Sequence, residues 1–146
     1  MNVTTGRLKH GFRVAEKMKQ AVENNPDICD ASADEVFLLG YLHDVGYNFV
    51  DRQEDHEQVG GKLLMTQGYK LWQEAYYHGV PKCEYKSNEL NLLNWADMTI
   101  DQSGKDVSMI ERLEDIKKRY GKNSVQYIKA VQLSEEIQTW MNKVGL

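Results

Sequence analysis

SADEVFLLGYLHDVGY, residues 32–47, is the stretch of sequence that decides the fold. Ser32 and Glu35 form an S-x-x-E capping box, and this pattern predicts the start of a helix. The apolar run that follows is continuous, which predicts a helix buried on most of its sides. His43 and Asp44 stand at the end of that run, just before Gly46. This order predicts a core helix that ends with two polar side chains at a cleft.

Helix signals recur on both sides of this stretch, and strand signals are nearly absent. An apolar stripe at helical spacing predicts the first helix: Leu8, Phe12, Ala15, Met18 and Val22. The residues NNPD (24–27) end that segment. DVGYNFVDRQ (44–53) is typical of a loop. Asp55 with Gln58 predicts a further helix start, and Gly68 is typical of the residue just after a helix. YKLWQEAYYHG (69–79) predicts a short aromatic helix that ends at Gly79.

Three serines predict the helices of the C-terminal half. Ser87 precedes NELNLLNWADMTI (88–100), and Ser108 forms a second capping box with Glu111 ahead of MIERLEDIKKRY (109–120). Ser124 opens the last helix, for which we expect this apolar face: Val125, Ile128, Ile137, Trp140, Met141 and Val144. The sequence therefore predicts a single all-α domain over residues 1–146, a bundle of about seven helices. Its motif-bearing part is 10–101, and its C-terminal helices occupy 107–144.

The composition is that of one ordinary globular domain. The chain has 146 residues, of which 41% are hydrophobic and 27% charged, and its net charge is −4. A mildly acidic chain carries no electrostatic signal for a nucleic acid polymer or an anionic membrane. Cys29 and Cys83 lie far apart, which favours two free thiols. There is no apolar core of a signal peptide and no run near the ~20 residues of a membrane span. We therefore expect a soluble cytoplasmic protein.

Four histidines and Asp97 carry the chemical signal. His10, His43, His56 and His78 each fall near an expected helix end, and Asp97 lies inside an apolar segment. Taken one at a time, each has an ordinary explanation: a hydrogen-bonded core histidine, or a carboxylate in a cap or an ion pair. Taken together, imidazole and carboxylate groups are what a divalent metal of intermediate hardness binds in proteins.

The ligands fall into two sets. His10, His43, Asp44 and Asp97 would offer two imidazoles and two carboxylates to one metal, with positions left for water or substrate. His56 and His78 could hold a second metal, with Asp44 bridging the two. We expect one or two divalent transition metals (Fe, Mn, Co, Ni or Zn), with Mg as a further option.

The order of these residues resembles the HD-domain superfamily of metal-dependent phosphohydrolases. The matching stretches are HGFRVAEKM (10–18), LGYLHDVGY (39–47), DHEQVGGKLLMTQGY (55–69), AYYHG (75–79) and NWADMTID (94–101). SMIERLEDIKKRYGKNS (108–124) is similar to the C-terminal part of small bacterial members. The resemblance implies an HD-domain helical bundle in which His10, His43, Asp44 and Asp97 bind the first metal. His56 and His78, with Asp44 as the bridge, match the extra histidines of two-metal members.

One position departs from that pattern. Many members follow the His-Asp pair with Gly-Lys, and the lysine helps to bind phosphate, whereas this chain has Tyr47. A phenol donates one hydrogen bond and carries no fixed positive charge. Phosphate recognition must then come from another cation. Arg13 is our candidate because it lies three residues after His10, on nearly the same helix face.

The expected reaction is hydrolysis of a nucleotide or another small phosphate ester by a metal-activated water, with Asp44 and Arg13 as the catalytic residues. The expected partner is a small phosphorylated metabolite or nucleotide, with no nucleic acid polymer and no membrane. The chain would act as a monomer or a homodimer. Two alternatives stay open. One is an HD-fold di-iron oxygenase, which the histidines at 56 and 78 permit. The other is a non-catalytic nucleotide-binding module.

Overall fold

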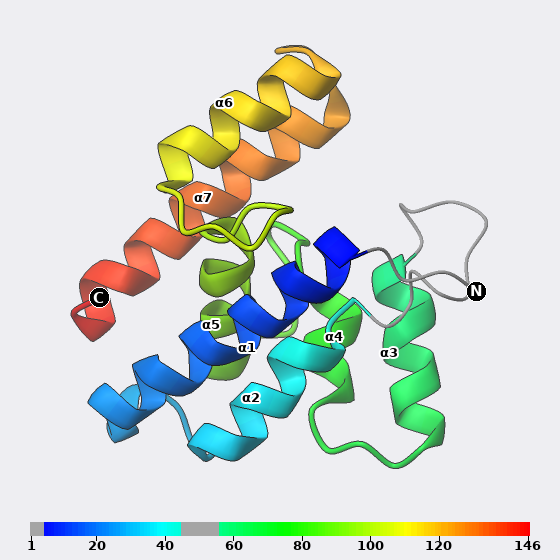
Figure 1. The fold of residues 1–146 in the computed structure, drawn as a ribbon, viewed down its shortest axis with the longest axis vertical. Helices are drawn as coiled ribbons and strands as arrows, with labels where there is room; N and C mark the ends of the chain where they lie inside the picture. Colours follow the sequence, from blue (N-terminus) through cyan, green and yellow to red (C-terminus); the bar gives the residue numbers. More distant parts are fainter. Residues whose placement is uncertain (1–4, 45–55) are drawn as a thin grey trace.

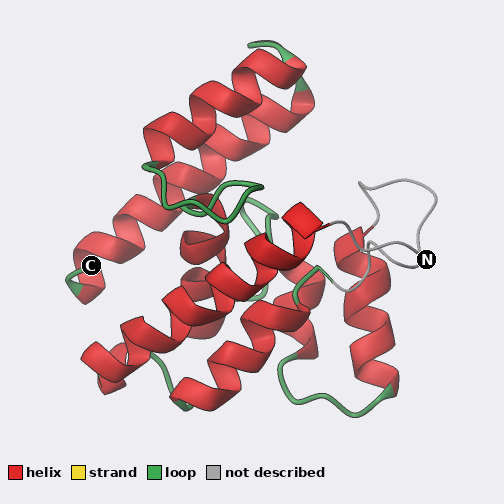
Figure 2. Ribbon diagram, in the orientation of Figure 1, coloured by secondary structure: helices red, strands yellow, loops and turns green. Residues whose placement is uncertain are grey.

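The computed structural model describes residues 5–44 and 56–146, and these residues form a helical bundle (Figure 1). The elements are α1 (Thr5–Asn24), η1 (Pro26–Ile28), α2 (Ala33–Leu42), α3 (His56–Thr66), α4 (Trp72–Tyr77), α5 (Asn88–Met98), α6 (Met109–Tyr120) and α7 (Val125–Val144). Figure 2 draws the described residues as helices and loops, with no strand among them. Within these ranges the one contact of strand type is an isolated antiparallel bridge between Ile100 and Asp106. The prediction of an all-α chain with about seven helices is confirmed.

The helix starts follow the capping residues of the sequence. Ser32 with Glu35, and Ser108 with Glu111, form complete capping boxes at α2 and α6. Ser87 caps α5 by accepting the N–H of Leu90, and Ser124 caps α7 in the same way. These hydroxyls satisfy backbone donors that have no partner inside the helix. The box expected at Asp55 lies outside the described residues.

The main core lies where α1, α2 and α5 meet. The central side chains are Val14, Met18, Leu39, Leu92 and Leu93, and each of them is completely buried. In Figure 1 the antiparallel helices α1 and α2 lie side by side, with α5 beside them in the middle of the bundle. This arrangement brings residues of the two halves of the chain to the same place.

The helices α6 and α7 form a hairpin that extends away from this core (Figure 1). A second apolar cluster joins the hairpin to the end of α5, and it contains Met98, Ala130, Leu133 and Ile137. Trp140, further along α7, belongs to the main core. The second half of α7 therefore connects the hairpin to the rest of the bundle.

Two of the predicted apolar faces are partly wrong. On α1, Leu8 is 51% exposed and Phe12 is also exposed, because the buried face is rotated to include His10. On α7, Val125 and Ile128 are exposed, and the cluster that joins this helix to α5 begins only at Ala130. The predictions for Ile137 and Trp140 are confirmed.

Two further expectations concern the cysteines and membrane-spanning helices. Cys29 and Cys83 are both buried and unpaired. None of the described helices combines the length and the apolar character needed to cross a bilayer.

Candidate metal centre

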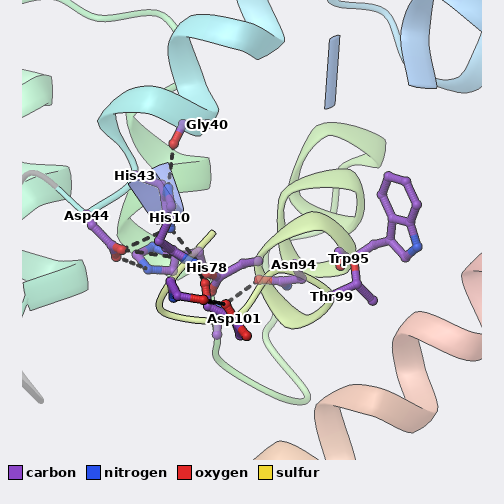
Figure 3. A network of polar contacts seen from close by, with 12 residues as sticks. His10, Gly40, His43, Asp44, His78, Asn94, Trp95, Thr99 and Asp101 are labelled. Atoms are coloured by element: carbon purple, nitrogen blue, oxygen red, sulfur yellow. Dashed lines mark hydrogen bonds and ion pairs between the residues drawn. The ribbon is translucent and has the colours of Figure 1, made fainter. Parts of the chain in front are cut away.

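Three of the four histidines converge in the interior, each from a different helix. His10 comes from the second turn of α1, His43 caps the C-terminus of α2, and His78 caps the C-terminus of α4. All three are buried. Asp44 directly follows His43, and Asp97 comes from the last turn of α5. Figure 3 shows the three imidazoles and Asp44 turned toward one another.

The Nε2 atoms of the imidazoles face the two carboxylates. His10 Nε2 lies 2.7 Å from Asp97 Oδ1, and His43 Nε2 lies 3.3 Å from the same oxygen. Asp44 Oδ2 lies 3.2 Å from His43 Nε2 and 3.9 Å from His10 Nε2. The other oxygen of Asp44, Oδ1, lies 3.5 Å from His78 Nε2. Asp44 thus contacts all three imidazoles and directs its two oxygens to different rings.

The opposite ring nitrogens are held by backbone carbonyls. His43 Nδ1 lies 2.6 Å from the carbonyl oxygen of Gly40, and His78 Nδ1 lies 2.6 Å from that of Ala75. A carbonyl oxygen only accepts, so each Nδ1 must carry the proton and donate it. This is the arrangement in which protein histidines present Nε2 to a metal.

His10 has the same arrangement, but its carbonyl comes from a distant segment. His10 Nδ1 lies 3.0 Å from the carbonyl oxygen of Asp101, in the loop that follows α5. The orientation of all three rings is therefore fixed through Nδ1, and Nε2 is directed at the carboxylates in each case.

The charges of this cluster are strongly coupled. Burial opposes the charged form of His43, but Asp44 and Asp97 outweigh it and hold the pKa of this imidazole well above its usual value. Burial likewise opposes the charge on His10, and Asp97 raises its pKa on balance. Burial would raise the pKa of Asp97, yet His43 and His10 lower it well below its usual value. The carboxylates thus favour positive charge between the rings.

The donor set fits a metal ion. A neutral imidazole whose Nδ1 donates to a carbonyl points its Nε2 lone pair at a carboxylate oxygen, so two acceptors face each other. Either a second proton on the ring or a cation between the two groups removes this repulsion. Two groups of ligand atoms lie close enough together to hold an ion, one from His10, His43 and Asp44 and the other from His43, His78 and Asp97. These His and Asp groups could hold a metal ion.

Some predicted site residues lie outside this cluster or outside the described part of the chain. His56 begins α3, but its side chain is not among the described ones, and Tyr47 lies in the segment 45–55. Arg13 forms ion pairs with Glu16 Oε1 at 2.9 Å and with Asp106 Oδ2 at 3.1 Å. Its contacts are thus with carboxylates that do not belong to the cluster. The phosphate-binding role of Arg13 stays a prediction.

The backbone groups that hold the rings were not predicted. The carbonyls of Gly40 and Ala75 lie three residues before His43 and His78, a spacing that any histidine at a helix end shares. Asp101 belongs to the turn DQSGKD (101–106), whose Gly104 adopts a left-handed φ of 87°. That glycine signals a turn, but no pattern in the sequence indicates that the turn reaches His10.

The same chain was compared with known proteins. No family model matches it, and neither the curated proteins nor the solved structures contain a match. The geometry of the His and Asp cluster is therefore the main evidence on function.

Proposed function

We propose that this chain is a metal-dependent phosphohydrolase of the HD type, acting on a nucleotide or another small phosphate ester. The observation that supports it best is the convergence of three Nε2 atoms on Asp44 and Asp97, with each Nδ1 held by a carbonyl. The order His10, His43-Asp44, His78 and Asp97, which resembles the HD superfamily, supports the same assignment.

Each residue has a definite part in this proposal. His10, His43, Asp44 and Asp97 would hold the first metal. His78 would bind a second metal, and Asp44 would bridge the two by giving its other oxygen to the second one. A bound divalent metal lowers the pKa of a coordinated water, which supplies hydroxide near neutral pH. Burial of the three imidazoles excludes bulk water from their side of the site. The side chains of Asp44 and Asp97 are 16% and 22% exposed, so a substrate would approach the cluster from the side of the carboxylates.

Metal quantification on freshly purified protein, beside a phosphate-release screen of nucleotides and sugar phosphates, tests the proposal. Asp44→Ala removes a carboxylate that contacts all three imidazoles. We expect it to lose bound metal and to lower turnover at least ~100-fold, since ligand and outer-shell changes of this kind cost 10–100-fold or more. Asp34→Ala is the control, because Asp34 is exposed and paired only with Lys19 in the described part of the chain. Full metal content and activity in Asp44→Ala would refute the site.

A di-iron oxygenase is the second candidate. The contact of His78 with Asp44 Oδ1, separate from the contacts at Oδ2, favours a bridging carboxylate and hence two metals. Bound iron with an oxygen-dependent absorption spectrum would support the oxygenase. Phosphate release with Mn²⁺ or Co²⁺ in the absence of oxygen would support the phosphohydrolase.

A further inference from the structure

We propose that Asp106 is a positioning residue for the metal centre. It holds the loop 99–107 against α1, and this loop orients His10. The inference rests on the proposed metal site and adds a residue that sets its affinity. Asp106 lies between α5 and α6 and has no contact with the cluster among those described.

The three imidazoles differ in where their carbonyl partners come from. His43 and His78 each donate to a carbonyl of their own helix, three residues earlier. His10 instead donates to Asp101, which is 91 residues away in the sequence. The orientation of the first two rings is thus secured by the helices that carry them. The orientation of His10 depends on how the loop 99–107 sits on α1.

The loop has an internal structure that fixes the Asp101 carbonyl. The N–H of Asp101 donates to the carbonyl of Lys105 at 2.8 Å, and the Asp101 carbonyl itself also accepts the N–H of Gly104 at 3.1 Å. The Asp101 carboxylate accepts the N–H groups of Ser103 and Lys105, both at 2.9 Å. These bonds tie the loop together, so a shift of one end would displace the carbonyl that accepts from His10.

The contacts of Asp106 with α1 hold this piece in place. Lys17 Nζ donates to Asp106 Oδ1 at 2.9 Å, and Arg13 Nη2 donates to Asp106 Oδ2 at 3.1 Å. Lys17 also donates to Thr99 Oγ1 at 2.6 Å, so one ammonium group holds both ends of the loop. Arg13 and Lys17 lie on the same helix as His10, about one and two turns away from it. We name this set of contacts the α1 clasp.

The α1 clasp can hold the loop in place because its contacts form a network. A single exposed ion pair contributes little, and Asp106 is 59% exposed. Here one carboxylate binds two cations, and the Lys17 side chain is only 18% exposed. Lys17 also lies over the ring of Trp95, 4.7 Å from its centroid, which restricts the ammonium group further.

Asp106→Asn and Glu16→Gln form a matched pair of variants. Both changes neutralise a carboxylate that binds Arg13 without changing its shape, but only Asp106 belongs to the loop. We would titrate chelator-treated protein with Co²⁺ and, on the metal-free protein, measure solvent exchange of the imidazole Nδ1–H groups by nitrogen-15 NMR. For Asp106→Asn we expect a dissociation constant for Co²⁺ roughly three to ten times higher, below the 10–100-fold typical of direct outer-shell partners.

The exchange measurement separates positioning from a general loss of structure. In Asp106→Asn the Nδ1–H of His10 should exchange faster, while those of His43 and His78 stay protected. Glu16→Gln should match the unchanged protein in both measurements. Equal behaviour of the two variants, or loss of protection at all three rings together, would overturn the inference. If the unchanged protein binds no Co²⁺, the proposed function fails, and the exchange of the His10 proton still decides the role of Asp106.

Discussion

His43 is buried completely, and burial alone would keep its imidazole neutral. Asp44 and Asp97 reverse that preference and raise the pKa of His43 well above 6.5, and Asp97 raises the pKa of His10. A group with a raised folded-state pKa stabilises the protein below its unfolded pKa. That contribution is lost as the pH rises through the folded pKa. In the metal-free state the two imidazoles therefore stabilise the folded protein on the acidic side of neutrality.

This sign predicts how the stability of the metal-free protein depends on pH. The thermal midpoint of chelator-treated protein should fall as the pH rises above about 6.5, because His10 and His43 lose protons that Asp97 and Asp44 favour. Asp97 has a lowered pKa, so its contribution is present above about 3.8 and disappears only in stronger acid. Calorimetry at a series of pH values measures this slope.

Two comparisons check the origin of that slope. In Asp97→Asn the partner of both imidazoles is neutral, so the fall above about 6.5 should become shallower. Saturating divalent metal should reverse the slope, because the metal competes with protons for Nε2 and binds better as the pH rises. A flat or rising midpoint in the metal-free protein would contradict the charge coupling described for this cluster.

At the level of elements, the close crossing of α1 and α2 decides where His43 lies. A Cβ on Gly40 would be 2.7 Å from Ala15 Cα and 2.9 Å from Ala15 N, so a side chain there would press on the backbone of α1. Gly40 also supplies the carbonyl that holds His43. The glycine thus sets the distance between the two helices that carry His10 and His43.

Gly40→Ala should therefore weaken both the fold and metal binding. Alanine gains up to ~1 kcal/mol in helix propensity, but forcing the helices apart costs typically 1–3 kcal/mol or more when backbone must move. We expect a net loss of about 1–2 kcal/mol in the free energy of unfolding, measured in urea, and weaker metal binding. Gly11→Ala is the control, since among the described residues its Cβ would meet only Tyr41 O, at 3.7 Å. This variant should be neutral or more stable by up to ~1 kcal/mol. An equally stable Gly40→Ala would contradict the packing constraint.

For the whole molecule, local sequence patterns predicted where the helices begin better than which side of each helix is buried. The serine caps of α2, α5, α6 and α7 act within one turn, so sequence alone predicts them. Which side of a helix is buried depends on its neighbours in space, and this is why Leu8 and Phe12 were assigned wrongly.

The same division holds for the candidate site. His10, His43, Asp44, His78 and Asp97 could be chosen as residue types suited to a metal, and the structure brings these five together. The contacts of the Asp101 carbonyl and of Asp106 with α1 could not be predicted from the sequence. They depend on how a turn packs against a distant helix, and no residue pattern in that turn indicates its partner. Side-chain chemistry is visible in a sequence, whereas the backbone groups that orient it are not.

The attachment of the α6–α7 hairpin gives a prediction for the whole molecule. Ile137 is buried in the cluster that joins α7 to Met98 of α5, and Met98 directly follows Asp97. Ile137→Ala removes three buried carbon atoms from this cluster and should lower the free energy of unfolding by about 2–5 kcal/mol. Val125→Ala makes a smaller truncation on the same helix at a 64% exposed side chain, so its effect should stay within ~0.5 kcal/mol. Urea unfolding monitored by tryptophan fluorescence measures both, because Trp140 lies on α7 in the main core.

The stability of those two variants at different protein concentrations tests whether a second copy covers the hairpin. If the hairpin is exposed in solution as it is in this chain, Val125→Ala unfolds at the same urea concentration in dilute and concentrated samples. A loss of stability in Val125→Ala that grows with protein concentration would mean that a second copy covers the hairpin, since an interface contributes by mass action. In that case part of the stability lost in Ile137→Ala would come from weaker self-association. Sedimentation of each variant would measure this part separately from the loss of core packing.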